Sequence, residues 1–378
     1  MSRRAVARID LSAIERNCSE LKRRLGAAEL CAVVKANGYG HGAAQSARAA
    51  LEGGATCLAV ATAEEAAELR RDGFGTRILV MGALGEDELR LALDANADVV
   101  AWREAFARRA AREANSRNVR ARVHVKLDTG MGRLGTRDPA EALGLVELAD
   151  QDESLELTGL MTHFATADEP DSTFFDEQLA CFAPIADQVR RAHPECVVHA
   201  ANSAAVFRDP RAHYDMARCG IAVYGLDPFH EDPAKRDLEP ALSLESYVAD
   251  VKPTAAGESV GYGRSWKAGR DTNVGVLPIG YGDGYRRGLS NKSDVIVGGR
   301  RFPVVGTISM DNITADLGPR TEVRAGDIAT LIGRQDGEQI LAEELATQLG
   351  TINYEVTCAI APRVPRVYHR GGSAVGSA

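Results

Sequence analysis

The sequence lacks the features that mark several classes of protein. Its seven cysteines are odd in number and contain no CxxC pair, which argues against zinc ribbons, a dithiol redox centre and a secreted disulfide framework. They are better interpreted as small buried thiols. No uninterrupted apolar run reaches the ~18 residues that a membrane helix needs. The N-terminal residues MSRRAVARIDL also lack the apolar core of a signal peptide, so we expect a cytoplasmic protein.

An excess of positive charge is absent as well. The 45 basic residues are outnumbered by 53 acidic ones, giving a net charge of −8, whereas nucleic-acid binding needs a basic surface. The sequence contains no HExxH, EF-hand or zinc-ligand spacing, so no metal is predicted. With 45% hydrophobic and 26% charged residues, the composition is typical of a globular protein, and 378 residues correspond to about two domains.

Residues 1–238 alternate short apolar runs with helical patterns. Most of the runs are uninterrupted, as expected for strands that are covered on both faces. Strands that alternate with helices predict βαβ units and a parallel sheet. The eight predicted strands are 30–34, 57–61, 77–81, 97–101, 122–128, 156–162, 197–202 and 214–218. Eight such units favour a closed (β/α)8 barrel, with a doubly wound open sheet as the alternative.

Two helix starts in this part carry capping signals. Ser12 and Glu15 have the S-x-x-E spacing of a capping box, and Gly26 is expected to end that helix. Thr62 and Glu65 repeat the spacing, so a second helix is predicted to begin there.

Residues 239–370 have a different pattern, which predicts a mainly antiparallel β domain. Short apolar runs separated by turn residues lie at 242–251, 274–279, 295–297, 303–305 and 328–332. Gly298 and Gly299 predict the turn of a hairpin. The proline- and charge-rich stretch 227–240 is the predicted linker, and the small residues 371–378 are expected to form a flexible tail.

Lys35 follows the first predicted strand immediately. A lysine at the C-terminal end of a barrel strand lies at the mouth where such barrels carry out chemistry. A desolvated lysine there can be neutral and nucleophilic, as Schiff-base chemistry requires. A solvated lysine at the end of a strand is the plainer alternative. The glycine-rich residues that follow do not form a Walker loop.

The fifth and sixth predicted strands also lead into polar residues. The segment 123–133, which leaves the fifth strand, carries Lys126, Asp128 and Arg133, and the planar guanidinium of Arg133 suits a carboxylate or phosphate partner. His163 ends the sixth strand. A salt-bridged loop and a structural histidine are the alternatives for these residues.

The last two predicted strands end in residues suited to a phosphate. Asn202 and Ser203 end the seventh strand, and Arg218 ends the eighth, followed by Gly220 and Ile221. The corresponding loops of such barrels commonly bind a phosphate. The Ser203 hydroxyl and the N–H groups of Gly220 and Ile221 could bind one here, with a helix N-terminus behind them. A phosphate site opposite a buried lysine predicts one cofactor, pyridoxal phosphate.

The sequence resembles the alanine racemase family along nearly its whole length. The segment AVVKANGYGHG around Lys35 is similar to the cofactor-lysine signature of that family. Further similar segments occur in order at 126–135, 162–164, 201–203, 218–225, 261–263, 279–285, 310–311 and 354–355. The family fold, a (β/α)8 barrel followed by a mainly β domain, agrees with the fold predicted from the residues.

The resemblance implies roles for several residues around the cofactor. Lys35 is expected to carry pyridoxal phosphate, Arg218 to face the pyridine nitrogen, and His163 to stack beside the ring and hold Arg218. An arginine does not readily protonate the ring, so the cofactor is a weaker electron sink, which favours reprotonation at Cα over side reactions. The residues expected to bind the rest of the cofactor are Tyr39, Asn202, Ser203, Gly220, Ile221 and Tyr354.

The resemblance also implies how an amino-acid substrate is held. Arg133 is expected to contact the cofactor phenolate oxygen and the substrate carboxylate. Lys126 matches a lysine that is carbamylated in many members of the family, and the carbamate would align Arg133. Tyr281 and Tyr354 match tyrosines that narrow the way into the pocket, and a small pocket favours alanine.

Racemisation needs one base on each face of a planar carbanion, and the resemblance assigns these bases to Lys35 and Tyr262. A free phenol, with a pKa of ~10, is a poor base at neutral pH, so its site must supply positive charge or a hydrogen bond. In the family this tyrosine, together with the Met310 and Asp311 positions, comes from the second subunit. The resemblance therefore implies a homodimer with shared active sites.

The sequence departs from the family pattern beside its predicted catalytic residues, at Gly38, Gly261, Gly282 and Ser309. These departures concern the size of the pocket and the breadth of substrates more than the reaction. The favoured function is interconversion of L-alanine and D-alanine, supplying D-alanine for peptidoglycan. A racemase of wider range acting on serine or basic amino acids is the second hypothesis. A non-catalytic pyridoxal-phosphate carrier is the third, and the β domain with Tyr262 argues against it.

Overall fold

The computed structural model describes residues 4–377, which divide into two compact units. The barrel unit comprises Glu15–Gly38 and Ala43–Val223, and the β unit comprises the other described residues, among them Tyr39–Gly42. No single cut along the chain separates these two units, because residues 4–14 and 39–42 group with residues 224–377. The predicted boundary at residue 238 stays a prediction.

Eight parallel strands form the sheet of the barrel unit, in the order β8-β7-β6-β5-β4-β3-β2-β9. They are β2 (Glu29–Val33), β3 (Cys57–Val60), β4 (Arg77–Val80), β5 (Asp98–Ala101), β6 (Ala121–Lys126), β7 (Leu155–Met161), β8 (Val197–His199) and β9 (Met216–Cys219). The N–H groups of Asp215 and Arg218 close the remaining gap, donating at 2.9 Å each to the carbonyls of Val198 and Ala201. The predicted barrel is confirmed, and the open sheet is not what forms.

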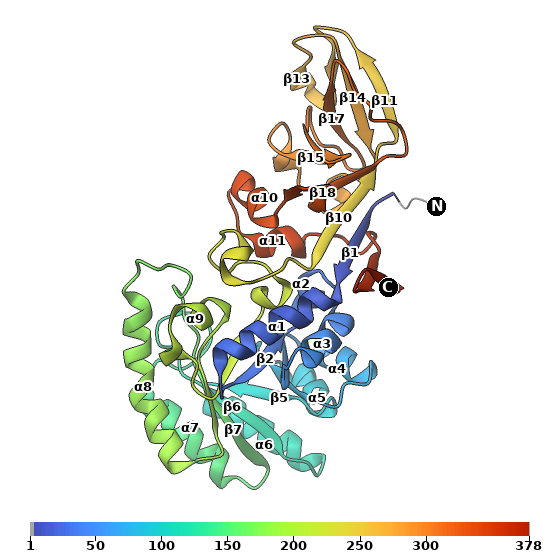
Figure 1. Cartoon of the computed structure of the whole chain (residues 1–378). Helices are drawn as coiled ribbons and strands as arrows, with labels where there is room; N and C mark the ends of the chain where they lie inside the picture. Colours follow the sequence, from blue (N-terminus) through green and yellow to red (C-terminus); the bar gives the residue numbers. More distant parts are fainter. Residues whose placement is uncertain (1–3, 378) are drawn as a thin grey trace. The chain divides into compact units, whose positions relative to one another are not determined.

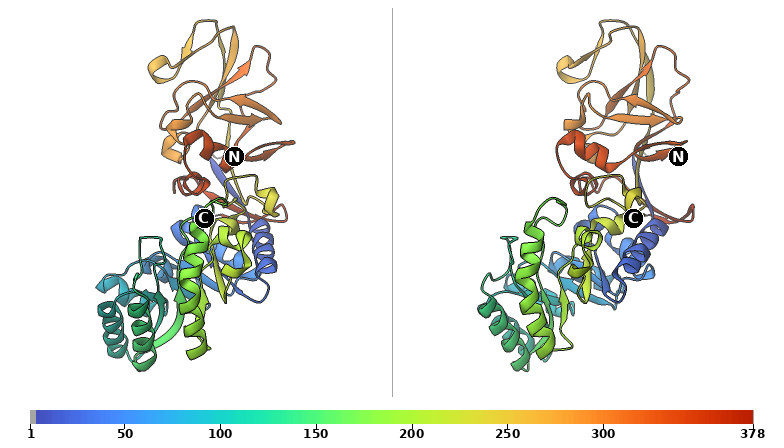
Figure 2. Two further views of the ribbon diagram at one scale, coloured as in Figure 1. Left: turned by 90° about the vertical axis from the view of Figure 1, so that its left-hand side faces the viewer. Right: turned by 60° about the vertical axis from the view of Figure 1, so that its left-hand side comes forward.

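Helices cover the outside of these strands, as Figures 1 and 2 show. They are α3 (Ala43–Glu52), α4 (Ala63–Arg71), α5 (Glu86–Asp94), α6 (Glu104–Ser116), α7 (Pro139–Gln151), α8 (Phe174–Ala192) and α9 (Ser203–Arg208). The buried residues of α6 are all alanines, whose small side chains allow close packing. Helices cover one face of the strands and the barrel interior covers the other, which agrees with the largely apolar sequence of most of them.

The capping prediction is right for one helix and wrong for the other. At the start of α4, Thr62 Oγ1 accepts from the Glu65 N–H at 3.3 Å while the Glu65 carboxylate accepts from the Thr62 N–H at 3.2 Å. The start predicted at Ser12 is wrong, because α1 (Leu11–Leu25) begins one residue earlier. The Asp10 carboxylate accepts from the Ser12 N–H at 2.9 Å, and a side chain in this position satisfies the helix start directly.

The β unit is mainly antiparallel, as predicted. Its strands are β1 (Val6–Asp10), β10 (Leu242–Tyr247), β11 (Asp250–Thr254), β12 (Ser259–Val260), β13 (Trp266–Lys267), β14 (Thr272–Leu277), β15 (Asp294–Val297), β16 (Arg300–Pro303), β17 (Ile313–Gly318), β18 (Ile328–Gln335), β19 (Glu338–Ile340), β20 (Arg366–Arg370) and β21 (Ser373–Ser377). One sheet has the order β16-β15-β18-β10-β1-β20-β21, with β19 on β18, and β11-β14-β17 and β12-β13 are separate. The predicted hairpin is confirmed, with φ of 57° at Gly298 and 70° at Gly299.

The first strand, β1, lies in the middle of the large sheet of the β unit. It pairs antiparallel to β10 and parallel to β20, and Ile9 within it is fully buried. The sequence interpretation assigned residues 1–238 to the barrel and predicted no strand before residue 30. The pairing partners lie more than 200 positions away, so no local pattern indicates them.

The C-terminal tail is a correction to the sequence interpretation. Residues 373–377 form β21, which pairs antiparallel to β20, instead of lacking regular structure. Gly371 and Gly372 join the two strands with φ of 55° and 81°, which is the positive-φ geometry of a two-residue hairpin turn. Main-chain pairing needs no apolar side chains, so the small residues of this segment did not indicate it.

Helices α10 (Ala342–Leu349) and α11 (Asn353–Cys358) complete the β unit, and α11 was not predicted. Within the described residues, no helix is long and apolar enough to cross a membrane. The prediction that the cysteines are buried holds for Cys18, Cys31, Cys57, Cys196 and Cys219. It is wrong for two others, at positions 181 and 358, whose side chains are exposed.

Candidate active site

Lys35 lies two residues beyond β2 and begins a strained turn labelled α2 (Lys35–Tyr39). The next four residues have positive φ, at 51° for Ala36, 53° for Asn37, 61° for Gly38 and 51° for Tyr39. An L-residue in this left-handed region costs roughly 1–2 kcal/mol. Consecutive residues of this kind persist only where the surrounding structure holds them, and such strain is concentrated at functional sites.

Side chains of the barrel unit hold this turn in place. The Glu65 carboxylate, which also caps α4, accepts from the Ala36 N–H at 2.6 Å. Asn37 Oδ1 accepts from the Ala43 N–H at 3.0 Å, and the Gly38 N–H donates to the Val34 carbonyl at 2.9 Å. The orientation of the backbone beside Lys35 is therefore fixed by the start of a neighbouring helix.

Lys126, the last residue of β6, is a second amine at the C-terminal end of a barrel strand. Its side chain is buried, and burial, together with the charges of Arg218 and Arg133, lowers its pKa to about 8. A lysine with this pKa is partly neutral near physiological pH, so it can act as a nucleophile.

Asp128 organises the loop that follows β6. Its carboxylate accepts from the N–H groups of Gly130 at 3.1 Å and Gly132 at 3.0 Å, and from Arg137 Nε at 3.3 Å. Burial alone would raise the pKa of Asp128, but these donors outweigh it and the pKa is lowered. Arg133, in the same loop, is exposed and makes no ion pair within the described residues, so its guanidinium can take an external anion.

The side chain of Arg218, from β9, is buried among neutral acceptors. Its Nη1 donates to His199 Nδ1 at 2.8 Å, and its Nη2 donates to the Thr162 carbonyl at 2.8 Å and to His163 Nδ1 at 3.2 Å. Burial lowers the pKa of Arg218 to about 10, so the group remains a cation at neutral pH.

His163 is held neutral in this cluster. Burial, followed by the positive charges of Arg218, Lys126, Arg133 and Lys35, holds the pKa of its imidazole well below the usual value. The acceptance of a hydrogen bond at Nδ1 leaves the proton on Nε2. Each of these four cations therefore lies close enough to His163 to influence the pKa of its imidazole.

The loops after β8 and β9 meet at Ser203. Its hydroxyl oxygen accepts from the N–H groups of Gly220 at 3.1 Å and Ala222 at 3.4 Å. Asn202 caps α9 by accepting from the Ala205 N–H at 2.9 Å. Ile221 begins a short 3-10 helix, η2 (Ile221–Tyr224), and its N–H makes no hydrogen bond in the part of the chain that the structure describes. The predicted phosphate-binding groups are thus brought together in the barrel unit, although the Gly220 N–H is engaged by Ser203.

The remaining predicted residues belong to the β unit: Tyr39, Tyr262, Tyr281, Met310, Asp311 and Tyr354. Tyr39 is buried, with its ring centroid 6.0 Å from that of Tyr354. By contrast, Tyr262 is 74% exposed, Met310 52% and Tyr281 41%. These three side chains are among the most exposed large hydrophobic residues in the described part of the chain.

Salt bridges that the sequence did not indicate hold two loops of the β unit together. The buried carboxylate of Asp283 pairs with Arg4 at 2.5 Å and with Arg363 at 2.8 Å. Arg363 also binds Asp311 at 2.9 Å, and the Tyr281 N–H donates to the Ser309 carbonyl at 3.0 Å. These contacts fix the loops that present the exposed Tyr281 and Met310 side chains.

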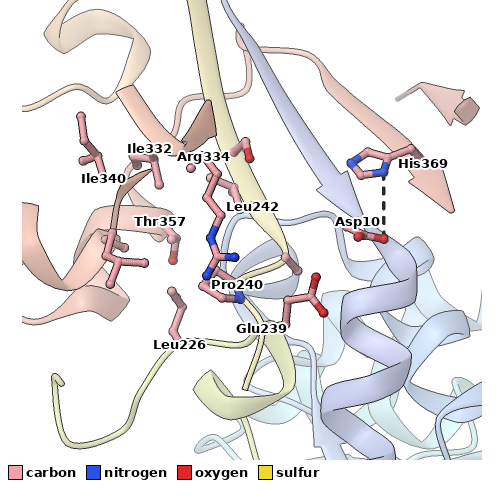
Figure 3. A pocket seen from close by; sticks show the side chains of 15 residues that line it. Asp10, Leu226, Glu239, Pro240, Leu242, Ile332, Arg334, Ile340, Thr357 and His369 are labelled. Atoms are coloured by element: carbon pink, nitrogen blue, oxygen red, sulfur yellow. Dashed lines mark ion pairs between the residues drawn. The ribbon is translucent and has the colours of Figure 1, made fainter. Parts of the chain in front are cut away.

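A cavity of about 170 Å³ also lies in the β unit, and Figure 3 shows its lining. Leu226, Leu242 and Ile332 contribute apolar surface, while Asp10 and His369 form an ion pair of 4.0 Å at one side. None of the predicted site residues lines this cavity. No cluster of three or more His, Cys, Asp or Glu side chains among the described residues is arranged to hold a metal ion.

The fold and the site together define a class of two-domain barrel enzymes. In the barrel unit, two lysines, two arginines and a neutral histidine gather at strand ends, a composition that suits anionic ligands. Comparison with known families agrees in both parts of the chain. Residues 9–228 match the alanine racemase N-terminal domain and residues 241–368 match the alanine racemase C-terminal domain. The chain belongs to the alanine racemase family.

Similar proteins cover almost the whole chain. An alanine racemase of Desulforamulus reducens is 42% identical over 365 residues, which are 96% of this chain and 98% of that protein. Alanine racemase 1 of Bacillus subtilis is 40% identical over 97% of this chain and 93% of its own length. The crystal structure of the Bacillus anthracis alanine racemase with bound L-Ala-P is 36% identical, with a TM-score of 0.91 over 100% of this chain and 98% of that one.

Proposed function

We propose that this chain interconverts L-alanine and D-alanine, with pyridoxal phosphate as its cofactor and Lys35 as the residue that carries it. The observation that carries the proposal is the position of Lys35 in a strained turn at the end of β2, within electrostatic range of the cationic cluster around His163. Membership of the alanine racemase family, found over both units, supports the same activity.

The residues of the barrel unit fit this cofactor. Ser203 Oγ and the N–H of Ile221 offer a hydroxyl and an unengaged donor to a phosphate. Arg133 offers a free guanidinium to the phenolate oxygen and to a substrate carboxylate. The chemistry that pyridoxal phosphate supplies is electron withdrawal from the substrate Cα, which makes its proton removable.

Arg218 suits the pyridine nitrogen because it donates a hydrogen bond without giving up its proton. Its pKa, about 10, remains high enough for it to stay charged at neutral pH. Its two Nη atoms are occupied by His199, Thr162 and His163, so the guanidinium cannot turn away. An unprotonated ring withdraws fewer electrons, and this favours return of a proton to Cα over competing reactions.

Two bases are needed to exchange the proton of Cα between opposite faces. We assign the D face to the Lys35 amine and the L face to the Tyr262 phenol. The Tyr262 side chain, at 74% exposure, is presented outward from its own chain, which suits a role in the site of a partner subunit. We propose that Met310 and Asp311 accompany it across the interface of a homodimer.

Lys126 suits modification by carbon dioxide. Only a neutral amine attacks CO2, and the lowered pKa, about 8, supplies this form at neutral pH. The ammonium first gives up one proton to water; the neutral amine then attacks the carbon of CO2, forms an N–C bond as one C–O π bond opens, and loses a second proton. A cation is thereby replaced by a carbamate anion with the release of two protons. The anion would lie near Arg133 and Arg218, the two cations that lower the pKa of the amine.

Alanine is the substrate that best suits the access residues. Tyr281 and Tyr354 are proposed to narrow the pocket, and a small pocket excludes larger side chains. The racemase of Bacillus anthracis is described with bound L-Ala-P, a ligand named for alanine. A cytoplasmic location and a supply of D-alanine to peptidoglycan stay predictions.

A chiral assay of the purified protein tests the proposed function. With pyridoxal phosphate added, the protein should convert L-alanine to D-alanine and D-alanine to L-alanine. Both rates should be at least tenfold higher than the rates at which it racemises L-serine or L-lysine. Equal rates on serine or lysine would favour the racemase of wider range. A protein that shows the visible absorbance of bound cofactor but racemises none of the three would be a carrier, and the proposed function would be wrong.

A further inference from the structure

A line of buried polar side chains crosses the interior of the barrel unit, from Arg218 on β9 to Asp98 at the start of β5. Arg218 is 3% exposed, His124 is 1% exposed, and Asp98 and His199 are not exposed. Burying polar groups is unfavourable unless each one is hydrogen-bonded. Four such groups in one line therefore depend on one another.

The distances form an unbroken chain of hydrogen bonds. Arg218 Nη1 lies 2.8 Å from His199 Nδ1, and His199 Nε2 lies 2.8 Å from His124 Nδ1. His124 Nε2 lies 3.2 Å from Asp98 Oδ2. At the far end, Arg122 Nε donates to Asp98 Oδ1 at 2.5 Å. The two arginines are thus joined through three intervening side chains.

The direction of these hydrogen bonds follows from the arginine at the barrel mouth. A guanidinium only donates, so His199 Nδ1 must accept and His199 carries its proton on Nε2. That proton points at His124 Nδ1, which must therefore accept, so His124 carries its proton on Nε2. This second proton is donated to Asp98. Each imidazole has one tautomer that satisfies all its partners, and the carboxylate of Asp98 ends the chain as an acceptor.

The barrel provides space for this arrangement. Gly159 on β7 pairs with His124 on β6, and the register of the two strands shifts beside His124. A Cβ atom at Gly159 would lie 2.2 Å from His124 Nδ1, so any other residue here would displace the imidazole. The two imidazole rings cross edge to face, with an interplanar angle of 85°. The lack of a side chain at Gly159 is a second observation, besides the hydrogen bonds, that the barrel accommodates the His124 imidazole in this position.

We propose that Asp98, His124 and His199 are positioning residues that fix the orientation of the Arg218 guanidinium. None of them is expected to touch the substrate or cofactor. His199 Nδ1 holds Nη1 of Arg218 only while His124 and Asp98 keep His199 in the Nε2-protonated tautomer. The consequence for catalysis rests on the proposed function, whereas the tautomers are a property of the protein itself.

The substitution Asp98→Asn tests the direction of the chain at almost constant volume. Arg122 only donates, so it will hold the amide oxygen and turn the amide NH2 toward His124. His124 must then accept at Nε2 and donate from Nδ1, which forces His199 to accept at Nε2 and to carry its proton on Nδ1. Two donors, His199 Nδ1–H and Arg218 Nη1–H, would then face each other at 2.8 Å in the unrelaxed structure.

The measurement is nitrogen NMR of the 15N-histidine-labelled holoenzyme, which distinguishes the two neutral tautomers of each imidazole. Wild type should show Nε2-protonated His124 and His199, and Asp98→Asn should show both inverted. The kcat of Asp98→Asn should fall roughly ten- to a hundredfold with little change in KM, because a displaced positioning group affects the reacting geometry.

The double variant Asp98→Asn/Arg122→Ala is the matched control. Without Arg122, the amide can turn its oxygen to His124 and restore both tautomers, so kcat should recover to within about threefold of Arg122→Ala alone. Unchanged tautomers in Asp98→Asn, or inverted tautomers with an unchanged kcat, would overturn the proposal. If the wild type has no racemase activity but Asp98→Asn still inverts both tautomers, the proposed function is rejected and the hydrogen-bond chain stands.

Discussion

At the residue scale, the barrel unit places cations where carboxylates would ordinarily balance them. Arg218 is buried, yet its hydrogen-bond partners are imidazole and carbonyl acceptors. Lys126 is buried beside Arg218 and Arg133, and its pKa is lowered to about 8 as a result. Such an excess of positive charge is unfavourable in the empty protein and favourable once anions bind, which is the arrangement expected for a cofactor phosphate and a substrate carboxylate.

Removal of the Lys35 amine is predicted to abolish both cofactor attachment and racemisation. In Lys35→Ala, the visible absorbance of the bound cofactor and the interconversion of alanine should both disappear, because the carrier and one base are the same group. Absorbance spectra and a chiral assay measure the two effects. A variant that still fixes the cofactor to another lysine on borohydride reduction would contradict the assignment.

Lys126 is predicted to make stability depend on pH. In the folded protein its pKa is about 8, against an ordinary value of 10.5, so between these values the unfolded chain binds more protons. The free energy of unfolding should therefore rise with pH across this range, by about 3 kcal/mol, and the penalty from burying the charged amine is fully present below pH 8. Urea unfolding at a series of pH values in CO2-free buffer measures this change in the free energy of unfolding.

Lys126→Met is the control for this measurement. The free energy of unfolding of Lys126→Met should not rise with pH in this range. At pH 7 the variant should be more stable than wild type, because no buried cation remains. In wild type, bicarbonate should abolish the rise of the unfolding free energy with pH if Lys126 becomes a carbamate, since a carbamate does not titrate as an amine. Identical pH curves for wild type and Lys126→Met in CO2-free buffer would contradict a buried amine of lowered pKa.

The residues at strand ends were predictable, whereas those inside the barrel were not. Lys35 follows β2, Lys126 is the last residue of β6 and Arg218 lies near the end of β9, and the barrel pattern indicates that such positions face the mouth. Asp98 is the only polar residue of β5, and His124 lies between Arg122 and Lys126 in β6. A polar residue inside a strand gives no indication of its partner, because the partner comes from a different strand.

At the element scale, the turn after β2 shows how one helix start holds the backbone beside Lys35, the residue proposed to carry the cofactor. Glu65 accepts from the Ala36 N–H, and also from the N–H groups of Ala61 at 2.8 Å and Thr62 at 3.2 Å. A single carboxylate thus caps α4 and stabilises the left-handed turn. The capping box was evident from the sequence, but its second role was not, because it depends on strand β3 lying beside β2.

Glu65→Ala is predicted to lower both stability and turnover. Loss of a cap and of a charged acceptor should reduce the free energy of unfolding by about 2 kcal/mol. The turn would also relax, and kcat should fall more than KM rises, because Lys35 loses its orientation. Glu64→Ala is the matched control, since Glu64 is exposed in the same first turn. Equal effects of the two substitutions would contradict the role of Glu65.

At the scale of the whole molecule, the order of elements along the chain differs from their grouping in space. The eight parallel strands were predictable because each is a local apolar run. The place of β1 between β10 and β20, and the pairing of β21 with β20, depend on partners that local patterns do not indicate. The sequence therefore predicted which regular elements form in the barrel better than it predicted which unit the ends of the chain join.

The central claim is that two bases on different chains act in one site, and mixing two inactive variants tests it most directly. Lys35→Ala and Tyr262→Ala proteins should each be inactive alone. After subunit exchange, each mixed dimer would hold one site with both native residues, and activity should return to about a quarter of wild type from random pairing. If the chains demonstrably exchange and no activity returns, Tyr262 does not act as the second base across a subunit interface.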